Sequence, residues 1–316
     1  MADWSTTAFL FPGQGSQVVG MGQDLAAAYS MAKQTFEEAD AILGIPFSKL
    51  CFEGPEEELN DTLNTQPSLY ICSIAILRVL QGELDDLNPI STAGHSLGEF
   101  TALTAAGALS FPDGVRLVRE RARLMKWAGE QHPGGMAALL GLDADKVTEV
   151  CAQATKETGR PVVMANDNCP GQVVISGDNT ALERAIELAT EAGAKRAVKL
   201  AVSVAPHSPL MEAASVQFRE ALSKTMFHTP RVPVYGNVNA QPLTTVAEIR
   251  AELDQQLTHS VRWTDSVRAM IAAGAERFVE LGPKDVLCGL LKRIDRSKPC
   301  ISLNSVQAVR QFIAQS

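Results

Sequence analysis

The stretch Ile90-Ser91-Thr92-Ala93-Gly94-His95-Ser96-Leu97-Gly98 ends in the pattern Gly-x-Ser-x-Gly. A short strand is predicted over Ile90–Ala93, and a helix rich in small residues over Leu97–Leu109. A strand, a sharp turn and a helix make a nucleophile elbow, in which flanking glycines let the backbones approach closely. This order predicts an α/β fold with Ser96 as the nucleophile; the alternative is a serine that caps an ordinary helix.

The position of Ser96 at a helix N-terminus has a chemical consequence. Free backbone N–H groups and the helix dipole favour a developing negative charge there. The N–H of Leu97 is the natural first donor to an oxyanion. The glycine-rich turn after the strand predicted over Thr7–Phe11 can supply a second donor. This turn is not a dinucleotide loop, because Val18 stands where Gly-x-Gly-x-x-Gly needs its third glycine.

A nucleophilic serine needs a general base, and His207 is the best placed of five histidines. It follows an apolar strand that ends at Val204, and Ser208-Pro209 after it predicts the start of a helix. A side chain at the carboxyl end of a strand faces the crevice where ligands bind. A structural histidine stays equally open, and no aspartate between Ser96 and His207 is an obvious orienting group.

Arg121 is a charge on the apolar face of a helix. Over Pro112–Gly129 the apolar side chains follow helical spacing, and Arg121 falls between Leu117 and Met125 on their stripe. A buried guanidinium needs an anionic or polar partner. Arg121 is therefore either part of a structural salt bridge, an arginine that reaches past the edge of the core, or a bidentate seat for a substrate carboxylate.

The chain is long enough for two domains, with 316 residues of which 46% are hydrophobic. A linker is predicted at His132-Pro133-Gly134-Gly135, and the segment after it has the order βαββαβ of a ferredoxin-like unit. We expect this small domain at 132–202, between parts of a large domain at 1–131 and 203–316. The predicted elements of the small domain are a strand (Met136–Leu142), a helix (Asp143–Thr158), a hairpin around Asn168-Cys169-Pro170-Gly171, a helix (Thr180–Ala192) and a strand (Ala197–Val204).

Composition excludes several classes of protein. The net charge of -8 argues against a nucleic-acid surface. The N-terminus lacks the pattern of a secretory signal, and no apolar run approaches the roughly 20 residues that cross a bilayer. Scattered cysteines predict reduced thiols, no metal site and a cytoplasmic location. They are Cys51, Cys72, Cys151, Cys169, Cys288 and Cys300.

Six ordered motifs together resemble the malonyl-CoA:acyl carrier protein transacylases. They extend over almost the whole chain, from near its start to about residue 293. The motifs are Phe11-Pro12-Gly13-Gln14-Gly15-Ser16-Gln17, Gly94-His95-Ser96-Leu97-Gly98-Glu99-Phe100, Arg121, Asn168-Cys169-Pro170-Gly171-Gln172-Val173-Val174-Ile175-Ser176-Gly177, His207-Ser208-Pro209-Leu210-Met211 and Glu280-Leu281-Gly282-Pro283.

The resemblance implies an α/β-hydrolase-like large domain with the ferredoxin-like domain inserted. It implies that Ser96 attacks malonyl-CoA, that His207 takes the proton, and that acyl carrier protein receives the malonyl group without a cofactor. The N–H groups of Gln14 and Leu97 would hold the oxyanion. Arg121 would bind the malonyl carboxylate, and the backbone carbonyl of Gln256 would orient His207, which accounts for the missing aspartate.

Some features leave the substrate and partners open. Pro206 stands where relatives commonly carry Phe or Ser, a position linked with acyl choice. Lys195-Arg196 and Lys292-Arg293 are candidates for docking an acidic carrier protein, or plain surface pairs. We expect a monomer. The alternatives are a trans-acting polyketide acyltransferase, a serine hydrolase or thioesterase, and a non-catalytic module that binds carrier protein.

Overall fold

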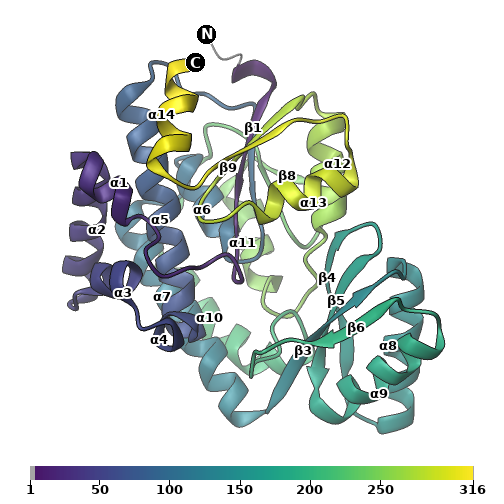
Figure 1. Ribbon diagram of the computed structural model, residues 1–316. Helices are drawn as coiled ribbons and strands as arrows, with labels where there is room; N and C mark the ends of the chain where they lie inside the picture. The colour runs from purple at the N-terminus through teal and green to yellow at the C-terminus, as the bar shows by residue number, and fades with distance from the viewer. Residues whose placement is uncertain (1–3, 316) are drawn as a thin grey trace.

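The computed structural model describes residues 4–315, and a six-stranded, mostly parallel sheet forms its centre (Figure 1). The prediction that the N-terminus lacks a secretory signal includes residues 1–3, which lie outside the described residues. The strands are β1 (Thr7–Phe11), β2 (Ser91–Gly94), β7 (Val234–Tyr235), β8 (Pro242–Leu243), β9 (Arg277–Leu281) and β10 (Cys300–Leu303). Their order is β10-β9-β1-β2-β7-β8, and every pair is parallel except β7 with β8. The turns that follow β1 and β2 therefore meet at one edge of the sheet, because Phe11 pairs with Gly94.

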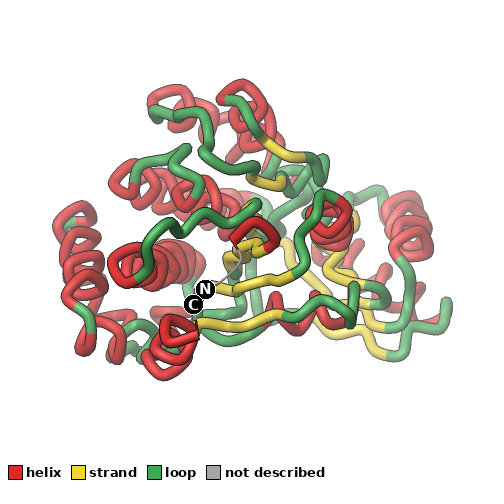
Figure 2. The backbone as a smooth tube through the Cα atoms, turned by 90° about the horizontal axis from the view of Figure 1, so that it is seen from above, coloured by secondary structure: helices red, strands yellow, loops and turns green. Residues whose placement is uncertain are grey.

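Both faces of this sheet are buried, as a parallel sheet requires. Along β1, Phe9 and Phe11 join the core on one face, while Ala8 and Leu10 join the core on the other. Figure 2 shows helices on both sides of the strands. The first core is completed by α1 (Gln23–Ala28), α2 (Ser30–Leu43), α3 (Phe47–Glu53), α4 (Glu56–Asn60), α5 (Thr62–Glu83), α6 (Gly98–Ala105), α7 (Phe111–Gln131), α10 (Glu212–Lys224), α11 (Val246–Gln255) and α14 (Val306–Gln315), and the second by α12 (Trp263–Ala272) and α13 (Val286–Ile294). Within residues 4–315, no helix is long and apolar enough to cross a membrane.

A second sheet forms the separate lobe at the lower right of Figure 1. Its order is β4-β5-β3-β6 with every neighbouring pair antiparallel, and two helices cover one face. The chain order is βαββαβ, as predicted. The elements are β3 (Gly134–Leu140), α8 (Ala144–Thr158), β4 (Val162–Cys169), β5 (Gln172–Asp178), α9 (Asn179–Glu191) and β6 (Arg196–Lys199).

The predicted strand over Ala197–Val204 is wrong in its second half. Strand β6 ends at Lys199, and the chain from Leu200 to Val204 leaves the sheet. Leu200 still donates its N–H to the carbonyl of Met136, but the next residues follow no partner strand. Their apolar side chains line a cavity between the two sheets, and this burial produces the pattern that resembles a strand.

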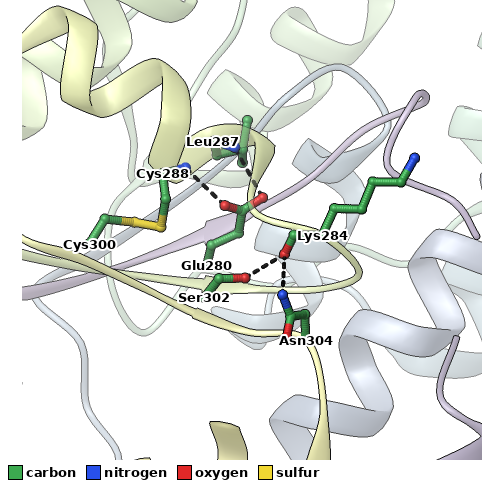
Figure 3. The surroundings of a disulfide bond; sticks show 7 residues. All are labelled: Glu280, Lys284, Leu287, Cys288, Cys300, Ser302 and Asn304. Carbon is green, nitrogen blue, oxygen red and sulfur yellow. Dashed lines mark hydrogen bonds between the residues drawn. A yellow bond between two sulfur atoms is a disulfide. The ribbon is translucent and has the colours of Figure 1, made fainter.

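The expectation that all six cysteines are reduced is wrong for one pair. Cys288 and Cys300 form a disulfide, shown in Figure 3, with their Cα atoms 5.3 Å apart. Helix α13 and strand β10 are sequential elements that pack together, so residues separated by 12 positions come into register. The other four cysteines are free thiols and buried.

Candidate active site

Ser96 occupies a strained turn between β2 and α6. Its φ of 51° lies in the left-handed region that residues other than glycine seldom adopt. The flanking glycines are sterically required: a Cβ on Gly94 would lie 1.9 Å from the carbonyl oxygen of Gly98, and one on Gly98 would lie 2.0 Å from that of Phe11. The helix is shorter than predicted, but the order of strand, turn and helix is the predicted one.

Asn237 holds the turn from the side. This buried residue follows β7, and its Oδ1 accepts the N–H of Ser96 at 2.7 Å. Its Nδ2 donates to the carbonyl oxygen of Gly94 at 2.8 Å. One amide therefore fixes the backbone on both sides of His95. Sequence reasoning missed Asn237, because nothing in its local pattern distinguishes it from the loop residues around it.

His207 lies beside Ser96 although 111 positions separate them, and its Nε2 is 2.8 Å from Ser96 Oγ. The other ring nitrogen, Nδ1, faces the carbonyl oxygens of Gln256 at 2.8 Å and His259 at 3.1 Å. Because carbonyl oxygens only accept, Nδ1 carries the ring proton and Nε2 is left free to accept the hydroxyl proton of Ser96. These carbonyls stand where an aspartate would be in a triad.

The surroundings of His207 keep it neutral. Its side chain is buried, and burial together with the nearby positive charge of Arg121 lowers the pKa of His207 to about 3. A neutral imidazole is the form that can act as a base. The ring is therefore ready to accept a proton throughout the neutral range.

Arg121 lies in the interior of α7, 1% exposed. Its Nη2 donates to Ser96 Oγ at 3.1 Å and to Gln256 Oε1 at 2.9 Å, and its Nη1 donates to Gln66 Oε1 at 2.5 Å. Burial lowers its pKa to about 10, so it remains a cation near pH 7. Among residues 4–315 no carboxylate forms an ion pair with it, so the structural salt bridge is not what the structure shows. A buried cation with neutral partners can accept an anionic ligand.

The three side chains open into a cavity of about 510 Å³ between the two sheets. Gln14 and Leu97 line it, and their backbone N–H groups donate to no acceptor within the described part of the chain. The far wall comes from the small sheet through Met136, Asn166 and Asn168, among others. The cavity thus holds a nucleophile, a base, unpaired amides and a cation.

The two basic pairs lie near each other although they are distant in sequence. Arg293 donates to Gln172 Oε1 at 2.5 Å and to the carbonyl oxygen of Pro170 at 3.0 Å. Lys195 packs over Gly141, whose N–H donates to the carbonyl of Gly171 at 2.9 Å. Arg196 and Lys292 are exposed beside them. Since Gln172 also lines the cavity, this cationic surface adjoins the cavity wall.

Taken together, these groups define a class of site. A serine whose proton a neutral histidine can take, with free amides beside it, can form and break an ester through an oxyanion. A buried arginine is able to bind the carboxylate of an acyl group. No cluster of His, Cys, Asp and Glu suited to a metal ion occurs within residues 4–315. Such a geometry suits the class of acyl-transfer enzymes.

Comparison with known proteins places the chain in a family. Residues 8–308 match the model of the acyl transferase domain. The malonyl CoA-acyl carrier protein transacylase of Bacillus subtilis is 45% identical, over 98% of this chain and 96% of that protein, and the one from Escherichia coli K12 is 45% identical over 96% and 97%. The chain therefore belongs to the acyl transferase family, among the malonyl CoA-acyl carrier protein transacylases.

Solved structures agree with this placement. The crystal structure of the malonyl-CoA:acyl carrier protein transacylase from Xanthomonas oryzae covers 100% of this chain and 99% of its own, with a TM-score of 0.94 and 43% identity. A malonyl-transacylase in complex with a type II polyketide synthase acyl carrier protein has a TM-score of 0.94 at 40% identity, with 98% of this chain and 99% of that one covered. The resemblance stated from the motifs is confirmed.

Proposed function

We propose that the chain transfers the malonyl group of malonyl-CoA to the phosphopantetheine thiol of acyl carrier protein, through an ester on Ser96. The observation that carries this proposal is the convergence of Ser96 Oγ on both His207 Nε2, at 2.8 Å, and Arg121 Nη2, at 3.1 Å. A nucleophile that touches a buried cation suits a substrate with a carboxylate two bonds from the reacting carbonyl. Malonyl thioesters have this arrangement.

The first half-reaction uses the groups in order. Ser96 Oγ attacks the thioester carbonyl while its proton passes to His207 Nε2, and the N–H groups of Gln14 and Leu97 hold the oxyanion. When the tetrahedral intermediate collapses, the C–S bond breaks and the CoA sulfur takes the proton from His207. The second half-reaction reverses these steps, with the carrier protein's thiol as nucleophile.

Arg121 would select the malonyl group over acyl groups without a carboxylate. A malonyl carboxylate would replace Ser96 Oγ as a partner of Nη2 and would reach the edge of the guanidinium that faces the cavity. Each charged hydrogen bond contributes roughly 1.5–3 kcal/mol, so a bidentate contact favours malonyl over acetyl by a large factor. The finer preference depends on the wall near Pro206, which also lines the cavity.

The two sheets support a proposal for domain organisation. Residues 132–202 would form a ferredoxin-like insert, since they contain the complete βαββαβ unit with its own core. Residues 1–131 and 203–316 would form an α/β-hydrolase-like body. All groups proposed for the chemistry belong to the body, so the insert serves to close the cavity.

The cationic surface around Lys195, Arg196, Lys292 and Arg293 would dock the carrier protein. Carrier proteins are acidic, and this chain is acidic overall, so a local positive surface next to the cavity would provide the needed complementarity. We further propose a cytoplasmic monomer in fatty acid synthesis that needs no cofactor and binds neither nucleic acid nor membrane. Supply of a polyketide carrier is the second candidate, favoured by the structural likeness to the polyketide complex.

Intact-mass spectrometry tests the function. The protein is incubated with malonyl-CoA, desalted, and then mixed with holo-acyl carrier protein from either pathway. We expect a malonyl adduct on the enzyme that persists in water and moves to the carrier protein. Loss of the adduct to water at the same rate with and without carrier protein would instead identify a hydrolase. The carrier that accepts malonyl faster identifies the pathway.

A further inference from the structure

The side chain of Gln256 lies behind both Ser96 and Arg121, and the proposed chemistry so far uses only its backbone. Its Oε1 accepts from Arg121 Nη2 at 2.9 Å, and its Nε2 donates to the carbonyl oxygen of Ser96 at 3.0 Å. The same Nε2 donates to Glu99 Oε2. The amide therefore has one productive orientation, with its oxygen toward the guanidinium.

Glu99 is the charged group that selects this orientation. It is the residue after Gly98 in the nucleophile turn, and its side chain is fully buried in the first turn of α6. An amide turned over would place its NH₂ against the Arg121 guanidinium and its oxygen against two acceptors. Both contacts would be repulsive, so Glu99 and the carbonyl of Ser96 together exclude the turned amide.

A second buried carboxyl, that of Glu252, explains how the Glu99 carboxyl can be buried in the protein interior. Glu252 of α11 lies within hydrogen-bonding reach of Glu99, and its Oε1 accepts the N–H of Val238 at 2.5 Å. Glu99 Oε1 and Glu252 Oε2 have no other partner within residues 4–315. Two neighbouring buried carboxyls that each have an oxygen without a donor are satisfied when one proton is held between them. Burial and mutual repulsion raise the pKa of Glu99, in keeping with such a proton.

We propose that Glu99 is a positioning residue for acyl-group selection. Joined to Glu252 by a shared proton, Glu99 holds the Gln256 amide so that the amide oxygen accepts from Arg121. This bond fixes the guanidinium in the orientation that binds the substrate carboxylate. This proposal rests on the proposed malonyl transfer. We expect Glu99 to affect the position of His207 less than that of Arg121. His207 is also held by the carbonyl oxygen of His259, and its backbone N–H donates to the carbonyl oxygen of Leu257.

Two substitutions of Glu99 separate hydrogen bonding from bulk. In Glu99→Gln, the amide oxygen can accept from Gln256 while the NH₂ donates to Glu252, so kcat/KM for malonyl-CoA should stay within about twofold. Glu99→Met has a similar length but offers only a weakly accepting sulfur in place of the carboxyl oxygens. We expect it to lose about tenfold or more in kcat/KM for malonyl-CoA, mainly through KM, with little change for acetyl-CoA. Thr101→Val, a buried change in the same helix away from Gln256, is the matched control.

A double-mutant cycle tests whether Glu99 acts through Gln256. Gln256→Leu keeps the backbone carbonyl that faces His207 and removes the amide. It should lower the malonyl-to-acetyl ratio as Glu99→Met does, and the double variant should be no worse than Gln256→Leu alone. Should Glu99→Met fail to fold, Gln256→Leu still measures the ratio.

Three results would overturn the proposal. The first is an unchanged malonyl-to-acetyl ratio in Glu99→Met or, if that variant does not fold, in Gln256→Leu. The second is an equal loss for both acyl groups, which would mean a general structural role. The third is a Glu99→Gln variant as impaired as Glu99→Met. Failure of the proposed function itself is read separately, as absence of a malonyl adduct on the unmodified protein.

Discussion

The parallel sheet and the antiparallel sheet border the same cavity but supply different groups to it. Each side chain that bonds to Ser96 comes from the body built on the parallel sheet, namely Arg121, His207, Asn237 and Gln256. The antiparallel sheet contributes wall residues such as Met136, Val174 and Asn166. The groups proposed for the chemistry therefore lie in one body, while the other lobe forms part of the cavity wall.

The contacts between the lobes have a different character from those around Ser96. His95 Nε2 lies 2.7 Å from Asn168 Oδ1, and the backbones of Asp167 and Val261 join at 2.9 Å. These polar bonds lie beside a shared apolar contact, because Cys169 of β4 packs with Val261 and Leu290 of the body. The serine turn, in contrast, is held by hydrogen bonds from side chains of the body alone. Changes to Ser96 or His207 should thus alter the rate, whereas changes in the small sheet should alter binding.

The largest loss of activity is expected when Arg121, a residue of the body, is replaced. Arg121→Ala should lower kcat/KM for malonyl-CoA by about 10²- to 10³-fold and that for acetyl-CoA far less, because the charged bonds to the carboxylate are lost. The ratio of the two rates in one assay measures this. Arg119→Ala in the same helix, whose guanidinium bonds to Leu63 and Asn64 away from the cavity, is the control. Equal losses for the two acyl groups would contradict a carboxylate clamp.

A second test concerns a part of the body remote from Ser96. Replacing Cys288 by Ser opens a disulfide that closes a loop of 12 positions, which should lower the free energy of unfolding by about 3 kcal/mol. Malonyl transfer at room temperature should be unchanged. Urea unfolding under non-reducing conditions gives the first value, and reduced wild-type protein should match the variant. A variant as stable as the oxidised protein would show that the disulfide does not constrain the fold.

A smaller effect is expected from the small sheet. Asn168→Ala removes the bond to His95 and should raise KM for malonyl-CoA about fivefold while kcat stays the same, since a neutral hydrogen bond contributes about 1 kcal/mol. Steady-state kinetics separate the two constants. A fall in kcat with unchanged KM would mean that the small sheet takes part in the chemistry, and the division between the lobes would fail.

The smallest expected effect is that of pH on kcat/KM. His207 must be neutral to accept a proton, and its pKa is lowered to about 3 by burial and by Arg121. Activity should fall only as the pH approaches that value from above, so kcat/KM should stay level from pH 7 down to about pH 5. An acid limb near pH 6.5, the ordinary range for histidine, would mean that the ring is more exposed to water than the structure shows.

Much of this site follows from local pattern. Strained turns need glycines at fixed offsets, so Gly94 and Gly98 mark Ser96 from the sequence alone. A guanidinium on an apolar stripe marks Arg121 in the same way. The order βαββαβ is likewise local, because each element has its own hydrophobic period.

The groups that the sequence does not reveal act across the fold. Asn237, Gln66 and Glu99 bond to partners that lie 55 to 157 positions away, and their local patterns are ordinary. The disulfide was missed because Cys288 and Cys300 meet only when α13 packs on β10. The strand predicted to reach Val204 failed because apolar side chains there line a cavity rather than a sheet.

The central claim is that Ser96 carries the acyl group, and peptide mapping by mass spectrometry tests it most directly. Protein incubated with malonyl-CoA is quenched in acid, digested and sequenced, beside a Ser96→Ala variant and a Ser203→Ala control. We expect a malonyl ester on Ser96 in the wild type and in the control, and none in Ser96→Ala. A malonyl group on any other residue, or an adduct that survives in Ser96→Ala, would contradict the claim.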